Sequence, residues 1–588
     1  MKDFVFDSAL SIYVHPQKPP IDYSDGGEEY LLNIFKNLKD IKSYDPELLT
    51  HIKDWASRYH LSLRRTNIME AVAEIFNKDS DVLELGSGCG AITRWLGENF
   101  RSVDAVEGSM ARAQVTRERT RDLANVNIFC GDMLDISCQP NKYRLVTLNG
   151  VMEYLPYYMS AEDPKKSCID YLKRLNTAIE EDGILLIAIE NKLGAKYFSG
   201  CSEDHSKLFE GLIGYPNKTP VTFSRNELQE MLSTSGFNNI QFYHTFPDYK
   251  LPETFFRESD ETLSLYPYNW IRTPFEDYSG GRFNIIPEPL LLKSLTQSGL
   301  LWHFSNSFLV LAGKSNKINL QTEWLIKKFF NNDAHKPIFH HTVALNKDRN
   351  NDYVVKRELI CPNETNPAQQ DIGFNLTETD RFISGELLLF DAYKGLMSDA
   401  PAEAIIKIMK EIHDNILLNY HQKEVDEHGY HLVDENAVDF VFWNLIKSSD
   451  GKLHFIDRKW SFKEKIPADF VLFRGLWGVY GVFAPFIKQK DLSLWIIDII
   501  KNIYPAYDME RFKKNIRLEE SFQSTVSTCP VTIDLSKYQP QYAMTEYIHP
   551  TDLNRQLAEK NKQIESLMNS YSWKVTAPLR RVLGLFKK

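Results

Sequence analysis

The residues best suited to chemistry follow an apolar run near residue 85. Residues 81–85 have the pattern of a buried strand, and Gly86, Gly88 and Gly90 follow it at alternate positions. Glycines spaced in this way let the backbone turn sharply and approach a ligand where a Cβ would clash. Residues 91–96 continue as a helix. The segment therefore predicts a nucleotide-cofactor site, and the alternative is a doubly wound fold that uses these glycines only for packing.

Three further strands should bring side chains to the same ligand. They are expected at residues 103–107, 127–133 and 143–149, each at the spacing of a strand in an α/β unit. Polar or soft side chains follow or end these strands: Glu107, Asp132, Met133 and Asn149. The acid that ends the first of the three is placed to accept hydrogen bonds from two ribose hydroxyls.

These strands resemble the class I S-adenosylmethionine methyltransferases. The resemblance implies that Glu84 and the glycine turn meet the methionyl part of the cofactor, and that Glu107 meets the ribose. It also implies that Asp132 meets the adenine amino group, with Met133 on the ring and Asn149 on the cofactor floor. NAD fits less well, because the turn lacks the later glycine of the pyrophosphate fingerprint and a sulfonium amino acid offers no diphosphate to a helix N-terminus.

Length and composition bound the rest of the molecule. A chain of 588 residues exceeds one hydrophobic core, so two or three domains are expected. The net charge of −10 argues against a general nucleic-acid binder. Seven cysteines without metal-site spacing read as reduced thiols, and the N-terminus has no signal-peptide pattern. The longest apolar run, 475–487, suits a buried helix better than a membrane span. A cytoplasmic protein is predicted.

The first two segments are expected at residues 1–65, mostly helical, and at 66–313, an α/β, Rossmann-like methyltransferase domain. Tyr59 lies in the N-terminal segment, where methyltransferases often close the cofactor site. Residues 59–62, 191–198, 203–205 and 246–252 together resemble methyltransferases encoded with bacterial surface-polysaccharide genes. His205 is the candidate base for an acceptor hydroxyl. A surface histidine beside helix-capping acids is the alternative, and an acceptor that is already an anionic phosphate would require no base.

A different pattern covers residues 320–545. Lys356 ends a short strand, residues 382–388 read as a hinge, and helices are expected at about 387–398 and 402–420. Asp439, Asn444 and Asp457 follow at spacings that resemble protein kinases. The resemblance implies that Lys356 holds the phosphates of ATP, that Asp439 accepts the proton of the attacked hydroxyl, and that Asn444 and Asp457 bind Mg²⁺.

This kinase-like pattern departs from the family at several points. No glycine-rich loop precedes Lys356, and little room remains for the helix whose glutamate normally pairs with that lysine. The catalytic loop has no arginine, and Arg458-Lys459 follow Asp457 in place of Phe-Gly. A kinase-like α+β domain is predicted, and its phosphotransfer activity is left open.

Residues 550–588 form the last segment. Leu553, Leu557, Ile564, Leu567 and Tyr571 suit a short coiled coil, which would permit a homo-oligomer, and a solvated helix is the alternative. The tail 574–588 carries five basic residues and no acid, as an anchor to the inner face of the cell membrane would. Residues 572–576 resemble ends seen on enzymes of bacterial polysaccharide assembly.

The order of these parts resembles bifunctional kinase-methyltransferases that cap O-antigen chains. In that family, phosphorylation and methylation of the non-reducing terminal sugar stop elongation. The resemblance implies a polysaccharide acceptor and, as a partner, a polymerase or glycosyltransferase. One alternative keeps the methyltransferase and makes residues 320–545 an inactive module that binds glycan or the polymerase. Another makes the whole chain a scaffold with a vestigial cofactor fold, against which the intact set of cofactor residues counts.

Overall fold

The computed structural model describes most of the chain. Outside the described part lie residues 2, 160–162, 204–208, 218–219, 272–274, 276, 279–285, 363–371, 484–491, 535–549 and 570–588. Within the described part, no helix is both long and apolar enough to cross a lipid bilayer.

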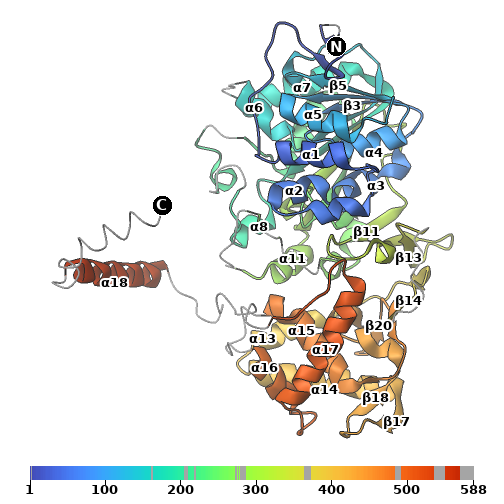
Figure 1. Cartoon of the computed structure of the whole chain (residues 1–588), viewed down its shortest axis with the longest axis vertical. Helices are drawn as coiled ribbons and strands as arrows, with labels where there is room; N and C mark the ends of the chain where they lie inside the picture. Colours follow the sequence, from blue (N-terminus) through green and yellow to red (C-terminus); the bar gives the residue numbers. More distant parts are fainter. Residues whose placement is uncertain are drawn as a thin grey trace.

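One mixed sheet runs through the upper part of the molecule and into its middle (Figure 1). Its strands, in spatial order, are β1 (Val5–Asp7), β2 (Ile12–Val14), β5 (Val126–Cys130), β4 (Ser102–Glu107), β3 (Asp81–Leu85), β6 (Tyr143–Asn149), β7 (Ile179–Glu190), β10 (Ser307–Gly313), β8 (Asn239–Phe246), β9 (Thr254–Arg257), β11 (Trp324–Phe330), β12 (His341–Lys347), β13 (Tyr353–Leu359) and β15 (Thr379–Arg381).

The strands β2 to β7 form a parallel doubly wound unit. The chain runs outward from β3 to β4 and β5, then crosses to β6 and β7 on the other side of β3. Strand β10 lies antiparallel between β7 and β8. The strand order reverses between β3 and β6, and ligands of open α/β sheets bind at such a switch point, outside the carboxyl ends of the strands.

Alternating side chains give this unit two cores. Val82 and Val103 belong to the core under α4 (Ala91–Asn99) and α5 (Met110–Arg119). Leu83 belongs to the core under α7 (Pro164–Ala178) and α9 (Arg225–Thr234). Both faces of the strands are buried, which explains why the sequence shows continuous apolar runs. The Rossmann-like fold predicted for this region is confirmed.

The N-terminal segment differs from the mostly helical expectation. It does contain α1 (Glu28–Asn37) and α2 (Trp55–Leu61), but β1 and β2 precede them and form a hairpin. Strand β2 then pairs in parallel with β5 and extends the sheet. A run of three residues is too short to show the alternation of a strand in the sequence. β2 is a strand because it pairs with β5, which is distant in the sequence, and β1 is a strand because it pairs with β2.

The sheet continues past the boundary predicted near residue 313. Strand β9 pairs with β8 on one side and with β11 on the other, and β12, β13 and β15 follow. Strands predicted to begin the second domain therefore belong to the same sheet as the cofactor strands.

A helical module lies below this sheet (Figure 1). The predicted helices at 387–398 and 402–420 correspond to α13 (Leu388–Leu396) and α14 (Pro401–Tyr420), and the apolar run at 475 starts within the buried α15. The module's other elements are α15 (Ala468–Phe483), α16 (Leu492–Ile500), α17 (Met509–Val526), β14 (Ile372–Phe374), β16 (Glu386–Leu387), β17 (His421–Val425), β18 (His431–Val433), β19 (Leu445–Lys447), β20 (Leu453–Phe455), β21 (Trp460–Phe462) and β22 (Ile466–Pro467).

Further helices complete the described part of the chain. They are α3 (Asn67–Glu70), α6 (Leu155–Tyr158), α8 (Ala195–Phe198), α10 (Asp260–Leu263), α11 (Glu288–Gln297), α12 (Leu301–Phe304) and α18 (Pro550–Asn569). The apolar side chains of Leu557, Ile564 and Met568 on α18 are exposed.

Candidate functional site

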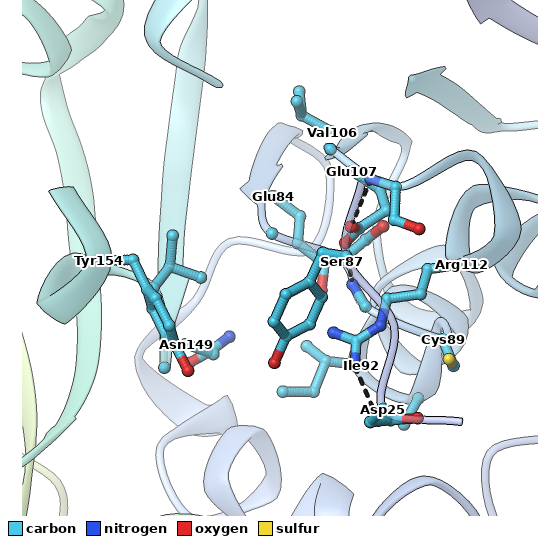
Figure 2. A pocket seen from close by; sticks show the side chains of 18 of the residues that line it. Asp25, Glu84, Ser87, Cys89, Ile92, Val106, Glu107, Arg112, Asn149 and Tyr154 are labelled. Carbon is cyan, nitrogen blue, oxygen red and sulfur yellow. Dashed lines mark hydrogen bonds and ion pairs between the residues drawn. The ribbon is translucent and has the colours of Figure 1, made fainter. Parts of the chain in front are cut away.

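A cavity of about 600 Å³ lies at the switch point of the parallel unit. The carboxyl ends of β3, β4, β5 and β6 border it, as the doubly wound topology requires. Most of the predicted cofactor residues line it: Tyr59, Glu84, Gly86, Gly88, Glu107, Asp132, Met133 and Asn149. Figure 2 shows Glu84, Glu107 and Asn149 around this one space.

Two glycines of the turn have different roles. Gly88 has φ +58°, and a Cβ added there would meet no atom within 4 Å, because the residue borders the open cavity. Gly90 has φ +78° and precedes α4, and its Cβ would come within 3.0 Å of Thr116 on α5. Gly90 does not line the cavity. It lets the turn pack closely against α5, and its assignment as a cofactor-binding residue stays a prediction.

The acid at the end of β4 orders the glycine turn. The backbone N–H of Gly88 donates to Oε2 of Glu107 at 2.7 Å, and that of Ser109 donates to Oε1 at 3.0 Å. Glu107 is buried, and this burial raises its pKa. A buried carboxylate that already accepts two N–H groups is held in one position, facing the cavity, where hydroxyl groups could donate to its remaining lone pairs.

Two other polar side chains, those of Glu84 and Asn149, face the cavity. Oε2 of Glu84 and both amide atoms of Asn149 are buried, and within the described part of the chain they have no hydrogen-bond partner. Burial raises the pKa of Glu84 to about 7. Buried polar atoms normally have partners, so these atoms suit a ligand that carries both a cation and hydrogen-bonding groups. S-adenosylmethionine, with its ammonium group and ribose hydroxyls, fits this donor set and would supply a methyl group on a sulfonium.

Asp132 and Met133, predicted to meet the adenine, both line the cavity. Asp132 caps the turn after β5, accepting from the N–H of Leu134 at 2.9 Å, and burial raises its pKa. Met133 lies next to it and also lines the cavity. The second carboxylate oxygen of Asp132 remains available for an amino group of the ligand.

One wall of the cavity comes from the N-terminal segment, in which the sequence analysis had selected only Tyr59. Asp25 accepts from Arg112 at 2.7 Å (Figure 2) and contacts Nε2 of His60 at 3.1 Å, and all three residues line the cavity. Arg112 also contacts Glu28 at 3.1 Å. No local motif marks this cluster, because its members come from three separate segments of the chain.

A second part of the cavity contains aromatic rings and one acid. Trp55 and Tyr278 stack with ring centroids 3.7 Å apart, and Arg65 lies over the Tyr59 ring at 4.4 Å. Glu153, which the sequence analysis did not select, lines the cavity with a side chain that is 2% exposed. The aromatic and acidic lining residues here are Trp55, Tyr59, Glu153, Tyr154, Tyr158, Tyr249 and Tyr278.

The predicted base His205 lies outside the described residues. Its neighbour Glu203 is buried, and its carboxylate accepts from the N–H of Gly211 at 2.6 Å. The role of His205 stays a prediction.

A separate cavity of about 340 Å³ lies between the end of the long sheet and the helical module. Val343 and Val355 border it from β12 and β13, Phe382 from the segment after β15, and Phe455 and Asp457 from the module. Lys356 is exposed on β13 and does not line this cavity, whereas the next residue, Arg357, is 7% exposed and does. Lys356, the residue predicted to hold the phosphates of ATP, thus lies outside this cavity, and its role stays a prediction.

The other kinase-like residues are engaged in internal contacts. Nε and Nη2 of Arg474 donate to Asp439 at 3.1 and 2.9 Å, and Arg474 also pairs with Glu519. Asn444 Nδ2 donates to the backbone oxygen of Asp439 at 3.2 Å. Asp457 accepts from Lys459 Nζ at 2.7 Å, and its Oδ1 lies 3.9 Å from Nε of Arg357. Asp457 lines the second cavity and Asp439 does not.

Comparisons with known proteins bear on the first cavity. Residues 58–242 match a family model described as a methyltransferase domain. Phosphoethanolamine N-methyltransferase 1 of Caenorhabditis elegans is 28% identical over 121 residues, which are 21% of this chain and 25% of that protein. Ribosomal RNA small subunit methyltransferase A of Streptococcus thermophilus is 34% identical over 104 residues, which are 17% of this chain and 36% of that protein. The chain thus spans between a quarter and little over a third of the length of these curated relatives.

Similar solved structures are methyltransferases as well. One from Thermotoga maritima, described as a possible histamine N-methyltransferase, covers 43% of this chain and 89% of its own, with 14% identity and a TM-score of 0.27. Phosphoethanolamine N-methyltransferase 1 of Haemonchus contortus, solved with phosphoethanolamine and S-adenosylhomocysteine, covers 50% of this chain and 52% of its own, with 13% identity and a TM-score of 0.28. The family match, the strand order and the cavity agree that this part of the chain is a class I S-adenosylmethionine-dependent methyltransferase domain.

Proposed function

We propose that the methyltransferase domain transfers a methyl group to the non-reducing end of a bacterial surface polysaccharide and thereby stops chain growth. The observation that carries the proposal is the aromatic wall beside the cofactor cavity, where Trp55 stacks on Tyr278 next to Tyr59. Aromatic faces cover the apolar side of a sugar ring, and tyrosine hydroxyls provide polar partners at its rim. A methyl group on the hydroxyl to be extended removes the next nucleophile.

The curated relatives act on other substrates by name, a phosphoethanolamine and a ribosomal RNA. RNA is the less suitable acceptor for this chain, since the net charge of −10 does not favour a polyanion. The acceptor assigned here rests on the resemblance to polysaccharide methyltransferases and on the shape and chemistry of the second part of the cavity.

The second cavity suggests a further ligand. In a kinase-like module it would take ATP with Mg²⁺, with Arg357 rather than Lys356 near the phosphates. Arg474 pairs with both Asp439 and Glu519, and this engagement of Asp439 favours the alternative that the module does not transfer phosphate. In that case it binds glycan or the polymerase and holds the growing chain near the methyltransferase cavity.

The tail and the last helix supply attachment in this proposal. The basic tail, residues 574–588, would contact the inner face of the cell membrane, and α18 would join copies of the chain. Deleting residues 572–588 should release the protein from the membrane fraction and lengthen the polysaccharide, while transfer to a soluble acceptor is unchanged.

The decisive experiment is mass spectrometry of polysaccharide ends. Cells with the wild-type chain should carry a terminal methyl group that cells with Gly88→Val lack. Labelled phosphate on the same ends, lost in Asp457→Ala, would show that the second module is an active kinase. Polysaccharide ends that are identical in wild-type cells and in cells with Gly88→Val would refute the proposed acceptor.

A further inference from the structure

We propose that Glu153 is the catalytic base that takes the proton from the acceptor hydroxyl. The inference rests on the proposed function in one respect: the acceptor is a hydroxyl-bearing molecule, as a sugar is. It assigns to a described residue the role that the sequence had given to His205.

Glu153 belongs to a segment that lies beside the glycine turn. It follows the end of β6 by four residues, in the short turn Met152–Tyr154. The preceding Val151 packs on the glycine turn so closely that a Cβ on Gly86 would lie 2.4 Å from Val151 Cγ2. The segment that carries Glu153 is thus fixed against the turn that borders the cofactor, and its side chain lines the same cavity as Glu84 and Asn149.

The carboxylate of Glu153 has one oxygen available for a ligand. Oε2 is buried and has no hydrogen-bond partner within the described part of the chain, whereas Oε1 lies 3.5 Å from the hydroxyl of Tyr249. A buried acceptor atom without a partner is rare and calls for an explanation. A hydroxyl group of the acceptor, donating to Oε2, supplies it.

The groups around Glu153 bring the pKa of its carboxyl group close to neutral pH. Burial raises the pKa of Glu153 to about 7, the charge of Glu190 raises it, and Lys250 lowers it. Lys250 lies 2.7 Å from Glu190, so its positive charge acts on the carboxylates of both Glu190 and Glu153. The nearby side chains of Tyr249, Tyr154 and Cys168 are neutral at this pH, and burial raises the pKa of each further.

A carboxylate with this pKa can accept a proton as the methyl group is transferred. The hydroxyl oxygen bonds to the methyl carbon, its O–H bond breaks, and Oε2 of Glu153 takes the proton. The electrons of the carbon–sulfur bond stay on sulfur, so a sulfonium and a carboxylate become a neutral thioether and a carboxylic acid. A phosphate acceptor would need no base and would be repelled by Glu153, so the methyl group should go to a sugar oxygen.

The test uses the full chain with labelled S-adenosylmethionine and a heat-treated envelope extract of cells that carry Gly88→Val. Glu153→Gln should lower kcat by about 100-fold or more while leaving the affinity for S-adenosylmethionine, measured by calorimetry, unchanged. Glu153→Asp should recover part of the rate. The matched control is Glu210→Gln, since Glu210 is also buried, its Oε2 has no hydrogen-bond partner among the described residues, and it does not line the cavity.

The pH profile separates catalysis from structure. With S-adenosylmethionine saturating, wild-type kcat should fall below about pH 7, and Tyr249→Phe should move this limb to higher pH because it removes a hydrogen-bond donor to the carboxylate. His205→Gln should keep the limb. A limb lost in His205→Gln, or a rate in Glu153→Gln equal to that of Glu210→Gln, would overturn the proposal.

The extract also distinguishes this proposal from the proposed function. Label on the polysaccharide fraction supports the proposed acceptor, and its loss in Glu153→Gln but not in Glu210→Gln supports the proposed base. Label on another fraction refutes the polysaccharide acceptor, and the Glu153 variants are then compared on that acceptor instead. A wild-type chain that labels no fraction overturns both.

Discussion

Lys356 and Arg357 are neighbours on β13 and point to opposite sides of the sheet. Lys356 is exposed to solvent, while Arg357 is buried with its Nε 3.9 Å from Oδ1 of Asp457. Successive side chains of a strand alternate between its two faces, so a shift of one residue decides which cation reaches the second cavity.

This alternation predicts which variant affects nucleotide binding. Arg357→Ala should weaken the binding of ATP with Mg²⁺, because a cation near the phosphates is lost, and Lys356→Ala should leave it unchanged. Calorimetry with the two single variants provides the comparison. Equal losses in both would contradict the placement of Arg357, and no ATP binding to the wild type would favour a glycan-binding or polymerase-binding module.

The glycine turn predicts a specific loss of cofactor binding. Gly88→Val should abolish the binding of S-adenosylmethionine, because the added side chain would enter the cavity. The control is Gly299→Val: Gly299 has φ +72° and open space around its Cβ, but does not line the cavity. Both substitutions should cost a similar free energy of unfolding, on the order of 1–3 kcal/mol, from backbone strain. Retained binding in Gly88→Val would refute the site.

Glu84 should make cofactor binding depend on pH. Its pKa is raised to about 7 by burial, so the carboxylate is ionised above that pH and protonated below it. Only the ionised form attracts the ammonium group, and affinity should therefore fall between about pH 8 and about pH 6. Glu84→Gln should weaken binding by on the order of 1.5–3 kcal/mol and flatten this dependence. A dependence that persists in Glu84→Gln would assign it to another group.

Arg474 should matter for stability more than for chemistry. Arg474→Met leaves Asp439 and Glu519 buried without their shared cation, which should lower the free energy of unfolding by about 3–5 kcal/mol. Lys452→Met removes an exposed ion pair and should change stability little. Thermal unfolding followed by tryptophan fluorescence compares the two. Similar melting temperatures would show that the buried group of three charges is not a structural element.

The exposed apolar side chains of α18 predict self-association. Leu557 is 60% exposed and Ile564 is 55% exposed, seven residues apart on one stripe of the helix. Light scattering should give an oligomer for the wild type and a monomer for Leu557→Asp with Ile564→Asp. Lys562→Asp, a charge change on the same helix, should keep the wild-type mass. A monomeric wild type would leave α18 as a solvated helix.

The cofactor site was predictable because its residues follow single strands. Glu107 and Asn149 end buried strands, Glu84 is the last residue but one of β3, and the carboxyl ends of parallel strands meet at one edge of the sheet. Glu153 escaped notice since its role depends on Tyr249, which lies almost a hundred residues further on. Lys356 was predicted from its place at the end of a short strand, and this place alone does not fix which face of the strand its side chain occupies.

The double pairing of β9 limits how this molecule can be divided. A fragment that ended at Gly313 would keep β8 and β9 but lose β11, leaving one side of β9 with unpaired N–H and C=O groups. Such an open edge is a template on which a second chain adds a strand, so the fragment would tend to aggregate. The part of the chain up to Gly313 therefore needs β11 to cover the open edge of β9, and any division of the chain at that point would have to supply another partner for this edge.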